Sequence, residues 1–589
     1  MSNPRTRGAL IALALAACQL DVEPNASDST MRDAARSTWT PREPSPSAGA
    51  VGNAAGAMGV DAGVSGASAP PAPSDAGAAA GSMGVTAGLS GAFSPPAPND
   101  AGMSEDAGAA ADSGGSIPPP PGDLRKAADL AQRFVGAAVN AQALQVDQRY
   151  AALLASELNS VTPELALQWG ALEPARGTRR FDEADSIVRA ALSDGQRIHG
   201  HAFVSQSEPP SWTTGLSADE LLTALHEHIQ QTVRRYKGQV TSWNVAHGAI
   251  ADSLQLREGI HAALGVTGIA QAFKWVKEED PEARLFYDDH GIEEPNPKTD
   301  ATVRLLEELL AAGAPIDAVG LQAHLDTQSY PSEPGLRANI QRFAALGLEV
   351  AYSELDVKTK TVDPEGTLMR RMEAQRVVYQ LLGGVCSTEP SCLGITVWGV
   401  TDANTSIAGD EPLLFDASYA RKPSFTGLVR GLSGQLPTAG PTLITNGDLD
   451  DGTSGWIAFG GGTLSTQTAI ARSGSAASVT DRAQTYAGPG HPLPAGLRSQ
   501  DALCLTAYVR VDSTSARIKA TIAATVDGVV GYSGIGTTVA SNTSWAEISG
   551  CRPIYFDGSV SEATLYFEGP EPGVSIYIDD VTLWTLTPN

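Results

Sequence analysis

Between residues 124 and 433, short apolar runs alternate with longer amphipathic stretches. Runs of this length are typical of strands, and stretches with the 3.6-residue period, such as 300–313, are typical of helices. Eight strand-helix units in a region of roughly 300 residues predict an α/β fold, the (β/α)8 TIM barrel. The predicted strands are 134–139, 158–162, 197–204, 240–246, 284–289, 318–324, 349–357 and 394–400.

Polar or aromatic residues stand at or just beyond the end of most of these runs. In a parallel barrel all strands end on the same face, where the chemistry of this fold takes place. We therefore expect these residues to converge on one mouth: Glu164, His201, His247, Asp288, His324, Glu354 and Trp398.

The pattern changes again over residues 441–589, where Thr, Ser and Gly separate short alternating segments. Period-two alternation with frequent turns predicts an all-β sandwich, here of the jelly-roll type, and 433–442 is the expected linker. Four cysteines form two groups, Cys386 with Cys392 and Cys504 with Cys551. An even number in an exported chain predicts two disulfides.

The N-terminus resembles an export signal. Arg5 and Arg7 precede an apolar core over residues 8–17, which ends in Leu-Ala-Ala before Cys18. Small residues followed by cysteine resemble a bacterial lipobox, so residues 1–18 predict a lipoprotein signal peptide with lipid on Cys18. An ordinary signal peptide with a chance cysteine is the alternative. We expect an exported protein that is held at the cell surface or the periplasmic side by a lipid anchor.

Residues 19–122 consist mainly of Ala, Gly, Ser, Pro and Asp, and segment 59–77 recurs at 84–102. Too few large apolar residues are present to build a core, so we predict a disordered tether rather than a solenoid. About 100 such residues would have a root-mean-square span of roughly 55 Å.

The formal net charge of the 589-residue chain is −26. A negative chain is repelled by phosphate, which argues against nucleic acid or an anionic membrane surface as a partner. The expected contact with a membrane is therefore the lipid anchor alone, and we expect a monomer.

Several motifs together resemble glycoside hydrolase family 10, the endo-1,4-β-xylanases. They are VTPELALQWGALEPARGTRRFDEAD, GHAFVSQSEPPSW, VGLQAHL, AYSELDVK and ITVWGVTDANTS, and they follow the family's order across 124–433. The resemblance implies a barrel that hydrolyses xylan with retention of configuration and needs no cofactor. It makes xylan or a related polysaccharide the expected partner.

The resemblance also implies roles for single residues. Glu354 in SELD matches the nucleophile, and Gln322 with His324 matches the polar pair beside it. Retaining glycosidases need a second carboxyl group about 5–5.5 Å from the nucleophile as acid and base. The remaining matches are to sugar-binding positions: Glu164, His201, Trp212 and Trp398.

The acid/base position departs from the family. The family's Trp-Asp-Val-Val-Asn-Glu-Ala corresponds here to Trp243 through Ala249, which places Gly248 at the acid/base and His247 at the asparagine before it. Glycine has no proton to donate, and a general acid contributes about 10²–10⁴-fold in rate. His247 is either a substitute proton donor or a polar filler. Sugar-binding positions have changed as well, to Leu165, Gln168 and Gln206.

The last region resembles a carbohydrate-binding module of the family-22 type. The resemblance places one group of residues along a sugar-binding groove: Arg482, Tyr486, Tyr532, Tyr566 and Glu568. The alternative is that the tyrosines belong to the core. Asp450 and Asp580 are candidates for a structural calcium site. Two functions are therefore open, a glycosidase with impaired hydrolysis and a non-catalytic xylan-binding surface lipoprotein.

Overall fold

The computed structural model describes residues 122–205, 209–364, 366–407, 409–498, 501–554 and 559–587. The predicted signal peptide, Cys18, the predicted tether up to residue 121, and Gln206 lie outside the described residues. Within the described ranges, no helix combines the length and the apolar character that crossing a membrane requires.

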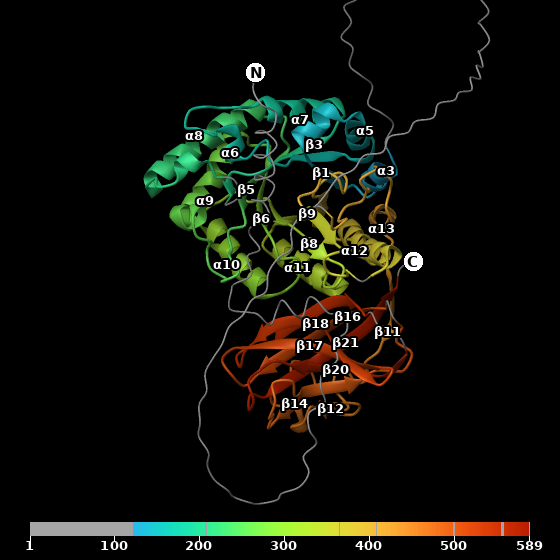
Figure 1. Cartoon of the computed structure of the whole chain (residues 1–589). Coiled ribbons are helices and arrows are strands. Elements are labelled where there is room, and N and C mark those ends of the chain that lie inside the picture. Colours follow the sequence, from blue (N-terminus) through green and yellow to red (C-terminus); the bar gives the residue numbers. More distant parts are fainter. Residues whose placement is uncertain are drawn as a thin grey trace, which may run out of the picture. The chain divides into compact units, whose positions relative to one another are not determined.

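Eight parallel strands close into a barrel, because β10 pairs with both β9 and β1. Figure 1 shows helices α7 to α12 on the outside of these strands. The barrel strands are β1 (Phe134–Val139), β2 (Ser160–Pro163), β3 (Arg197–Gly200), β5 (Ser242–His247), β6 (Arg284–Asp289), β7 (Ala318–Leu321), β9 (Glu349–Lys358) and β10 (Cys392–Val397). Two short strands, β4 (Val204–Ser205) and β8 (His324–Asp326), pair with β5 and β9.

The helices around the barrel are amphipathic and capped. In α8, Leu221, Leu225 and Ile229 follow one another at intervals of four and are buried, which fixes the face turned to the core. Ser217 and Glu220 form a capping box at its start. The helices are α3 (Asp123–Leu130), α4 (Ala141–Val146), α5 (Gln148–Glu157), α6 (Trp169–Leu172), α7 (Asp182–Ser193), η1 (Ser211–Thr213), α8 (Ala218–Tyr236), α9 (Ile260–Glu279), α10 (Pro297–Ala311), α11 (Glu333–Ala345), α12 (Leu368–Thr388) and α13 (Pro423–Leu432).

Two predicted strands are each divided in the structure. The run 197–204 forms β3 and β4, and the run 318–324 forms β7 and the first residue of β8. Ala323 lies between β7 and β8 with φ of 60°, a left-handed conformation that no strand can contain. Both interruptions fall near the strand ends that carry predicted site residues.

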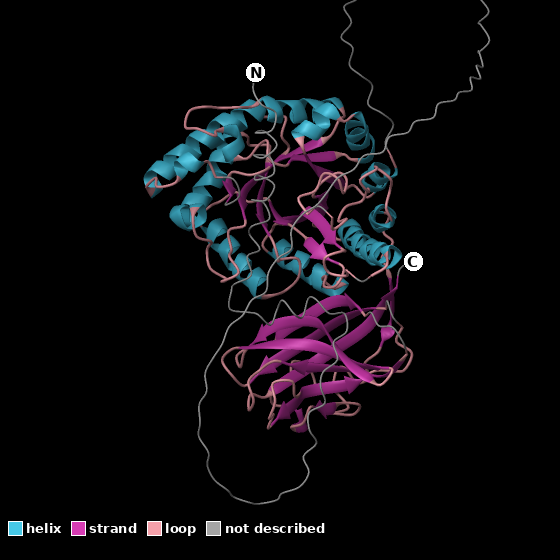
Figure 2. Cartoon of the chain, in the orientation of Figure 1, coloured by secondary structure: helices cyan, strands magenta, loops and turns pink. Residues whose placement is uncertain are grey.

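Residues 438–587 form two antiparallel sheets, drawn as strands in Figure 2. Their order is β13-β14-β21-β16-β19, with β11 beside β21, and β12-β15-β20-β17-β18. The strands are β11 (Thr438–Thr442), β12 (Ile457–Phe459), β13 (Thr463–Gln467), β14 (Ala476–Thr480), β15 (Gly488–Pro492), β16 (Ala502–Val511), β17 (Ala516–Val526), β18 (Val529–Ala540), β19 (Ala546–Pro553), β20 (Val560–Glu568) and β21 (Ile576–Thr587).

A single apolar core lies between these two sheets. Alternate residues of β16, among them Leu503 and Leu505, pack with Ile518 of β17 and Leu565 of β20. The alternation predicted from the sequence therefore forms a sandwich. Disulfides join Cys386 to Cys392 and Cys504 to Cys551, the pairs that the sequence indicated.

Candidate active site and sugar-binding face

Glu354 lies in β9 with only 4% of its surface exposed. Both carboxylate oxygens accept hydrogen bonds from histidines. His247, the last residue of β5, approaches Oε1 with its Nε2 at 3.1 Å, and Nε2 of His324 lies 3.1 Å from Oε2. Nδ1 of His324 is held by Asp356 at 2.9 Å. The strand ends thus bring Glu354 between two imidazoles, one of which is anchored by a further carboxylate.

The carboxylate of Glu354 and the imidazoles of His247 and His324 stabilise one another's charged forms. Although burial alone would raise it, the hydrogen bonds from His247 and His324 hold the pKa of Glu354 well below its usual value. Burial disfavours the imidazolium of His247, but the hydrogen bond and the charge of Glu354 raise its pKa to about 9. His324 has a raised pKa for the same kind of reason, despite its burial, because Asp356 and Glu354 flank it. At neutral pH Glu354 is therefore an anion between two cations.

His201 and Trp398 close the floor of the mouth. Nδ1 of His201 lies 3.9 Å from Oε1 of Glu354 and accepts from the Asn244 amide at 3.2 Å. The ring of Trp398 meets that of His201 nearly edge-on, with centroids 5.4 Å apart. Glu164, just after β2, is half-buried, and burial together with Glu354 raises its pKa to about 7. The structure therefore brings these predicted residues together around Glu354.

Gln322 and Asp288 complete the group beside His247. The amide nitrogen of Gln322 lies 2.8 Å from Nε2 of His247, so it competes with Glu354 for the same nitrogen. Asp288 is fully buried, and neither of its oxygens has a hydrogen-bond partner of ordinary geometry among the described residues. Burial, and then the charge of Glu354, raises the pKa of Asp288 to about 7. Sequence reasoning placed Asp288 at the mouth but did not foresee a buried carboxylate without such a partner.

Gly248 follows directly after β5 and leaves space at the mouth. Its φ is 66°, and a Cβ built on it would meet nothing within 4 Å. Its N–H donates to the Asp288 carbonyl at 2.8 Å, and its carbonyl accepts from Nε of Arg257 at 2.7 Å. The backbone here is fixed by hydrogen bonds in a left-handed conformation that suits glycine.

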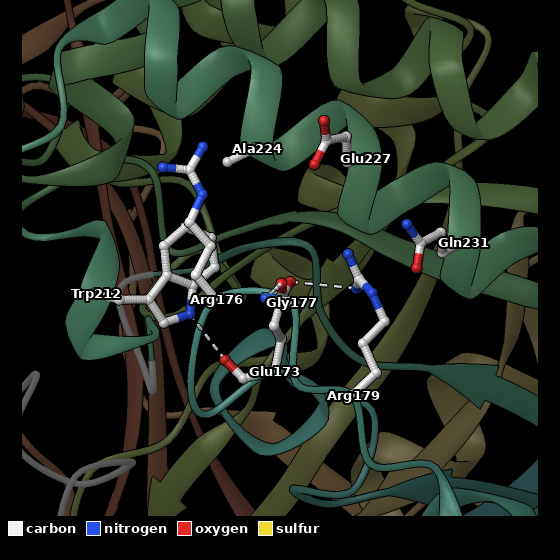
Figure 3. A pocket seen from close by; sticks show the side chains of 8 residues that line it. All are labelled: Glu173, Arg176, Gly177, Arg179, Trp212, Ala224, Glu227 and Gln231. Atoms are coloured by element: carbon white, nitrogen blue, oxygen red, sulfur yellow. Dashed lines mark hydrogen bonds and ion pairs between the residues drawn. The ribbon is translucent and has the colours of Figure 1, made fainter.

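Trp212 does not join the Glu354 group. Its indole Nε1 donates to the Glu173 carbonyl at 2.9 Å, and its ring packs against Trp169. It borders a separate cavity of about 490 Å³, together with residues of α8 and of the segment after α6, as Figure 3 shows. This differs from the expectation of a tryptophan at the edge of the catalytic mouth. The reason is local, because η1 directs Trp212 toward the Glu173 segment.

One face of the five-stranded sheet in the sandwich carries aromatic side chains. The strand register aligns Tyr566 with Gly490 and Thr521, and Ala523 with Tyr532. Tyr566 stacks on Phe459 with centroids 4.0 Å apart and meets Tyr532 edge-on at 6.4 Å. Glu568, two residues along the same strand, accepts from the Thr521 hydroxyl at 2.6 Å. Sequence reasoning missed Phe459, although the spacing of Ile457 and Phe459 in β12 was a signal for one shared face.

Arg482, which was predicted for the groove, is placed differently, whereas the position of Tyr486 agrees with either interpretation. Arg482 is 2% exposed, and its guanidinium donates to backbone carbonyls, including those of Ala487 at 2.5 Å and Val574 at 2.6 Å. The prediction that Arg482 lines a groove therefore differs from the structure, because its donors hold loops together. Tyr486 is half-buried, and its ring lies against Gly460.

Asp580 does not fit the predicted calcium site in this arrangement. Its carboxylate forms an ion pair with Arg472 and accepts from the Ser473 hydroxyl at 3.1 Å. Calcium prefers a cage of oxygen ligands, and a guanidinium stands where the cation would bind. Asp450 is exposed and lies against Gly474. In the barrel, by contrast, His201, His247 and Glu354 place three donor atoms within 4.8 Å of one another.

Known proteins of similar sequence share the barrel. Residues 123–430 match glycosyl hydrolase family 10. The endo-1,4-beta-xylanase B of Thermotoga neapolitana is 32% identical over 286 residues, which are 47% of this chain and 82% of that protein. The beta-1,4-xylanase of Dictyoglomus thermophilum is 33% identical over 300 residues, 48% of this chain and 84% of that protein.

A solved structure agrees with this match. The xylanase 10B of Thermotoga petrophila RKU-1, in complex with xylobiose, is similar with a TM-score of 0.50 at 31% identity, and the similarity covers 52% of this chain and 96% of that one. The family match spans more than half of the sequence and coincides with the closed parallel barrel. The chain therefore belongs to glycosyl hydrolase family 10.

Proposed function

We propose that this chain binds xylan and hydrolyses it slowly or not at all. Relatives that align over most of their own length are named endo-1,4-beta-xylanases, which supports xylan as the polysaccharide. The impaired step is the chemistry at Glu354 rather than the fold around it. The observation that carries the proposal is the hydrogen bond between His247 and Glu354.

A retaining nucleophile needs an oxygen free to attack the anomeric carbon. Here His247 lies 3.1 Å from Oε1 and His324 lies 3.1 Å from Oε2, so both oxygens are hydrogen-bonded. Charge-assisted hydrogen bonds of this kind stabilise the carboxylate in the ground state. Attack on a sugar would have to break at least one of them, which lowers the reactivity of Glu354.

Neither His247 nor Asp288 is well placed to act as the proton donor in place of residue 248. The two carboxyl groups of a retaining pair lie about 5–5.5 Å apart, so that the glycosidic bond fits between them. Nε2 of His247 is only 3.1 Å from Glu354 and directs its proton at the nucleophile. Asp288 is fully buried and cannot reach a leaving group at the mouth. These positions support a lost acid at Gly248 without a substitute from either residue.

Sugar positioning supports the same proposal. Gln168, predicted at a former sugar-binding position, is 1% exposed. Trp212 lines the separate outer cavity. Hydrogen bonds that position the sugar contribute to catalysis by holding the reacting atoms in line. Their loss, in addition to the missing acid, favours binding over turnover.

The test uses substrates that differ in their need for an acid. An aryl xyloside with a good leaving group needs little protonation, whereas polymeric xylan needs it. We expect very slow release of sugars from xylan and weak labelling of Glu354 by a mechanism-based fluoro-xyloside, with Glu354→Gln as the unlabelled control. Rapid hydrolysis of xylan by the unchanged protein would overturn the proposal. Azide-accelerated turnover of the aryl xyloside would show that Glu354 still attacks.

The aromatic sheet face favours the second candidate function, a non-catalytic xylan-binding surface lipoprotein. Tyr532 and Phe459 are partly exposed and offer a stacking surface that needs no catalytic group, whereas Tyr566 between them is 2% exposed, as expected for the core alternative. The role of Cys18 as the lipid anchor belongs to this proposal. Cys18→Ser should release the protein from the membrane fraction, and an unchanged membrane-bound fraction would contradict the anchor.

A further inference from the structure

Three potential metal-ligand atoms, from His201, His247 and Glu354, lie within 4.8 Å of one another on one side of the Glu354 carboxylate. Oε1 of Glu354 lies 3.1 Å from Nε2 of His247 and 3.9 Å from Nδ1 of His201. Oδ1 of Asp288 lies 3.9 Å from the same Nε2 of His247. A tetrahedral ion with bonds of about 2.0–2.1 Å places its ligand atoms roughly 3.3 Å apart. The pairs of atoms at 3.1 Å and 3.9 Å from Oε1 of Glu354 are close to this spacing, and Asp288 borders them beside His247.

Two buried carboxylates in the cluster can share one divalent cation. Glu354 and Asp288 are 4% and 0% exposed, and Asp288 has only weak hydrogen-bonding interactions, with Ser353 and Gln322. A buried carboxylate with weak partners is costly, because it loses its hydration and gains little in exchange. A divalent cation would displace the proton that His247 holds in the metal-free site, and with two carboxylates and two neutral imidazoles the net charge would then be zero.

The surroundings hold the ligand atoms in position. His324 binds only Oε2 of Glu354 and is itself fixed by Asp356, which leaves Oε1 turned toward the cluster. Nδ1 of His201 accepts from Asn244, so it carries a lone pair, which a metal ion would take in place of the amide. Gly248 leaves open space beside the cluster.

We propose that His201, His247 and Glu354, with Asp288 beside His247, form a binding site for a transition-metal cation of the Zn²⁺ type. Two imidazole nitrogens with carboxylate oxygens suit zinc, whereas calcium and magnesium prefer oxygen ligands alone. The bound ion would occupy Oε1 of Glu354 and so block the residue as a nucleophile. The inference does not rest on xylan being the ligand, since it concerns the side chains alone.

The experiment is a titration of the untagged full-length chain with ZnCl₂ by calorimetry, with excess CaCl₂ present to saturate oxygen-only sites. Co²⁺ serves as a second probe, because tetrahedral cobalt with nitrogen ligands absorbs strongly in the visible range. We expect one Zn²⁺ per chain and this absorption band. His247→Asn and Asp288→Asn should each weaken the affinity at least about tenfold, since even indirect partners of metal ligands contribute 10–100-fold.

The matched control is His226→Asn. His226 lies on α8 and stacks on Trp275, with centroids 4.2 Å apart, so it belongs to another part of the barrel. Its variant should bind Zn²⁺ like the unchanged protein. Equal affinities of the unchanged protein and His247→Asn would overturn the proposal. The thermal midpoint of each variant without metal shows that it is folded, and a Zn²⁺-induced rise confined to proteins with His247 supports the site independently.

Discussion

The mouth of the barrel and the aromatic face of the sandwich carry polar and aromatic groups in opposite arrangements. In the mouth, Glu354 binds both His247 and His324; Glu354 and His247 are buried, and His324 is exposed but paired. On the sheet face, Tyr532 and Phe459 remain partly exposed and contact mainly other rings. Groups that are already paired gain little from a ligand, whereas exposed rings gain by stacking. Under the proposed function, the difference favours the sandwich over the barrel as the surface that binds the sugar.

The strongest test of this comparison restores the acid in the barrel. The double variant His247→Asn and Gly248→Glu releases Oε1 of Glu354 and supplies a carboxyl group. We expect its hydrolysis of xylan to exceed that of the unchanged protein by about 10²-fold, the lower end of the contribution of a general acid. The φ of 66° at residue 248 should lower its stability by about 1–2 kcal/mol. Reducing-sugar release from xylan measures the rate.

Its control is the double variant His247→Asn and Gly248→Ala. Alanine at residue 248 has to adopt the same left-handed φ as glutamate but carries no carboxyl group. If both double variants hydrolyse xylan equally slowly, Gly248 does not mark the missing acid. Restoration should remain partial, since Gln168 and Trp212 still contribute nothing to holding the sugar.

A second test weakens the sandwich face. Tyr532→Ala should reduce the xylan affinity of the whole chain by about 1–3 kcal/mol, the order for loss of a central interface aromatic. Tyr577→Ala is the matched control, because Tyr577 lies in β21 of the other sheet. Affinity electrophoresis in soluble xylan measures both. An equal loss in the two variants would place the sugar elsewhere.

A third test uses the pH dependence of the stability of the barrel, which contains a buried histidine. His228 in α8 is fully buried and stacks on Trp169 with centroids 5.0 Å apart. Burial, and then Arg179, lower its pKa to about 3, below the unfolded value of about 6.5. Its contribution to stability is therefore complete above pH 6.5 and is lost as the pH falls toward 3.

His228→Phe removes this titration and keeps the stacking. Below pH 6.5, the free energy of unfolding of the barrel should fall more steeply in the unchanged protein than in the variant, by up to about 1.4 kcal/mol per pH unit. Denaturant unfolding followed by tryptophan fluorescence at several pH values measures the difference. Parallel curves for the two proteins would contradict the assignment.

The smallest effect is expected at Phe459. Phe459→Ala removes the ring stacked on Tyr566 and should weaken xylan binding by about 0.5–1.5 kcal/mol, the usual value of an aromatic pair beyond its buried area. Phe459→Tyr keeps the stacking and should bind normally. If Phe459→Ala also binds normally, the sugar-binding part of the face does not extend to β12.

Much of the fold was predictable, because parallel barrel strands end on one face. The runs 134–139 and 284–289 match β1 and β6 residue for residue, and the polar residues that follow such runs meet around Glu354 as predicted. The contacts themselves were less predictable. Nothing in the sequence shows that His247 turns to Glu354, since this depends on side-chain rotamers and on Gln322 beside it.

Arg482 illustrates the same limit in the sandwich. An arginine in a β module can line a groove or hold loops together through backbone carbonyls, and the sequence pattern is the same for both. The choice depends on which carbonyls the folded loops present, and here those of Ala487, Val574 and Pro570 surround the guanidinium. Trp212 differs for a similar reason, because the segment that carries Glu173 offers its indole an acceptor.

The left-handed backbone at Gly248 has a consequence for the history of the chain. A reversion to glutamate would return a carboxyl group to the mouth, but it would also meet a φ of 66° and a His247 already bonded to Glu354. A single reverse mutation would therefore lower stability before it improved the chemistry. Neighbouring substitutions act in this way as an evolutionary ratchet, in which each later change makes the earlier one harder to undo.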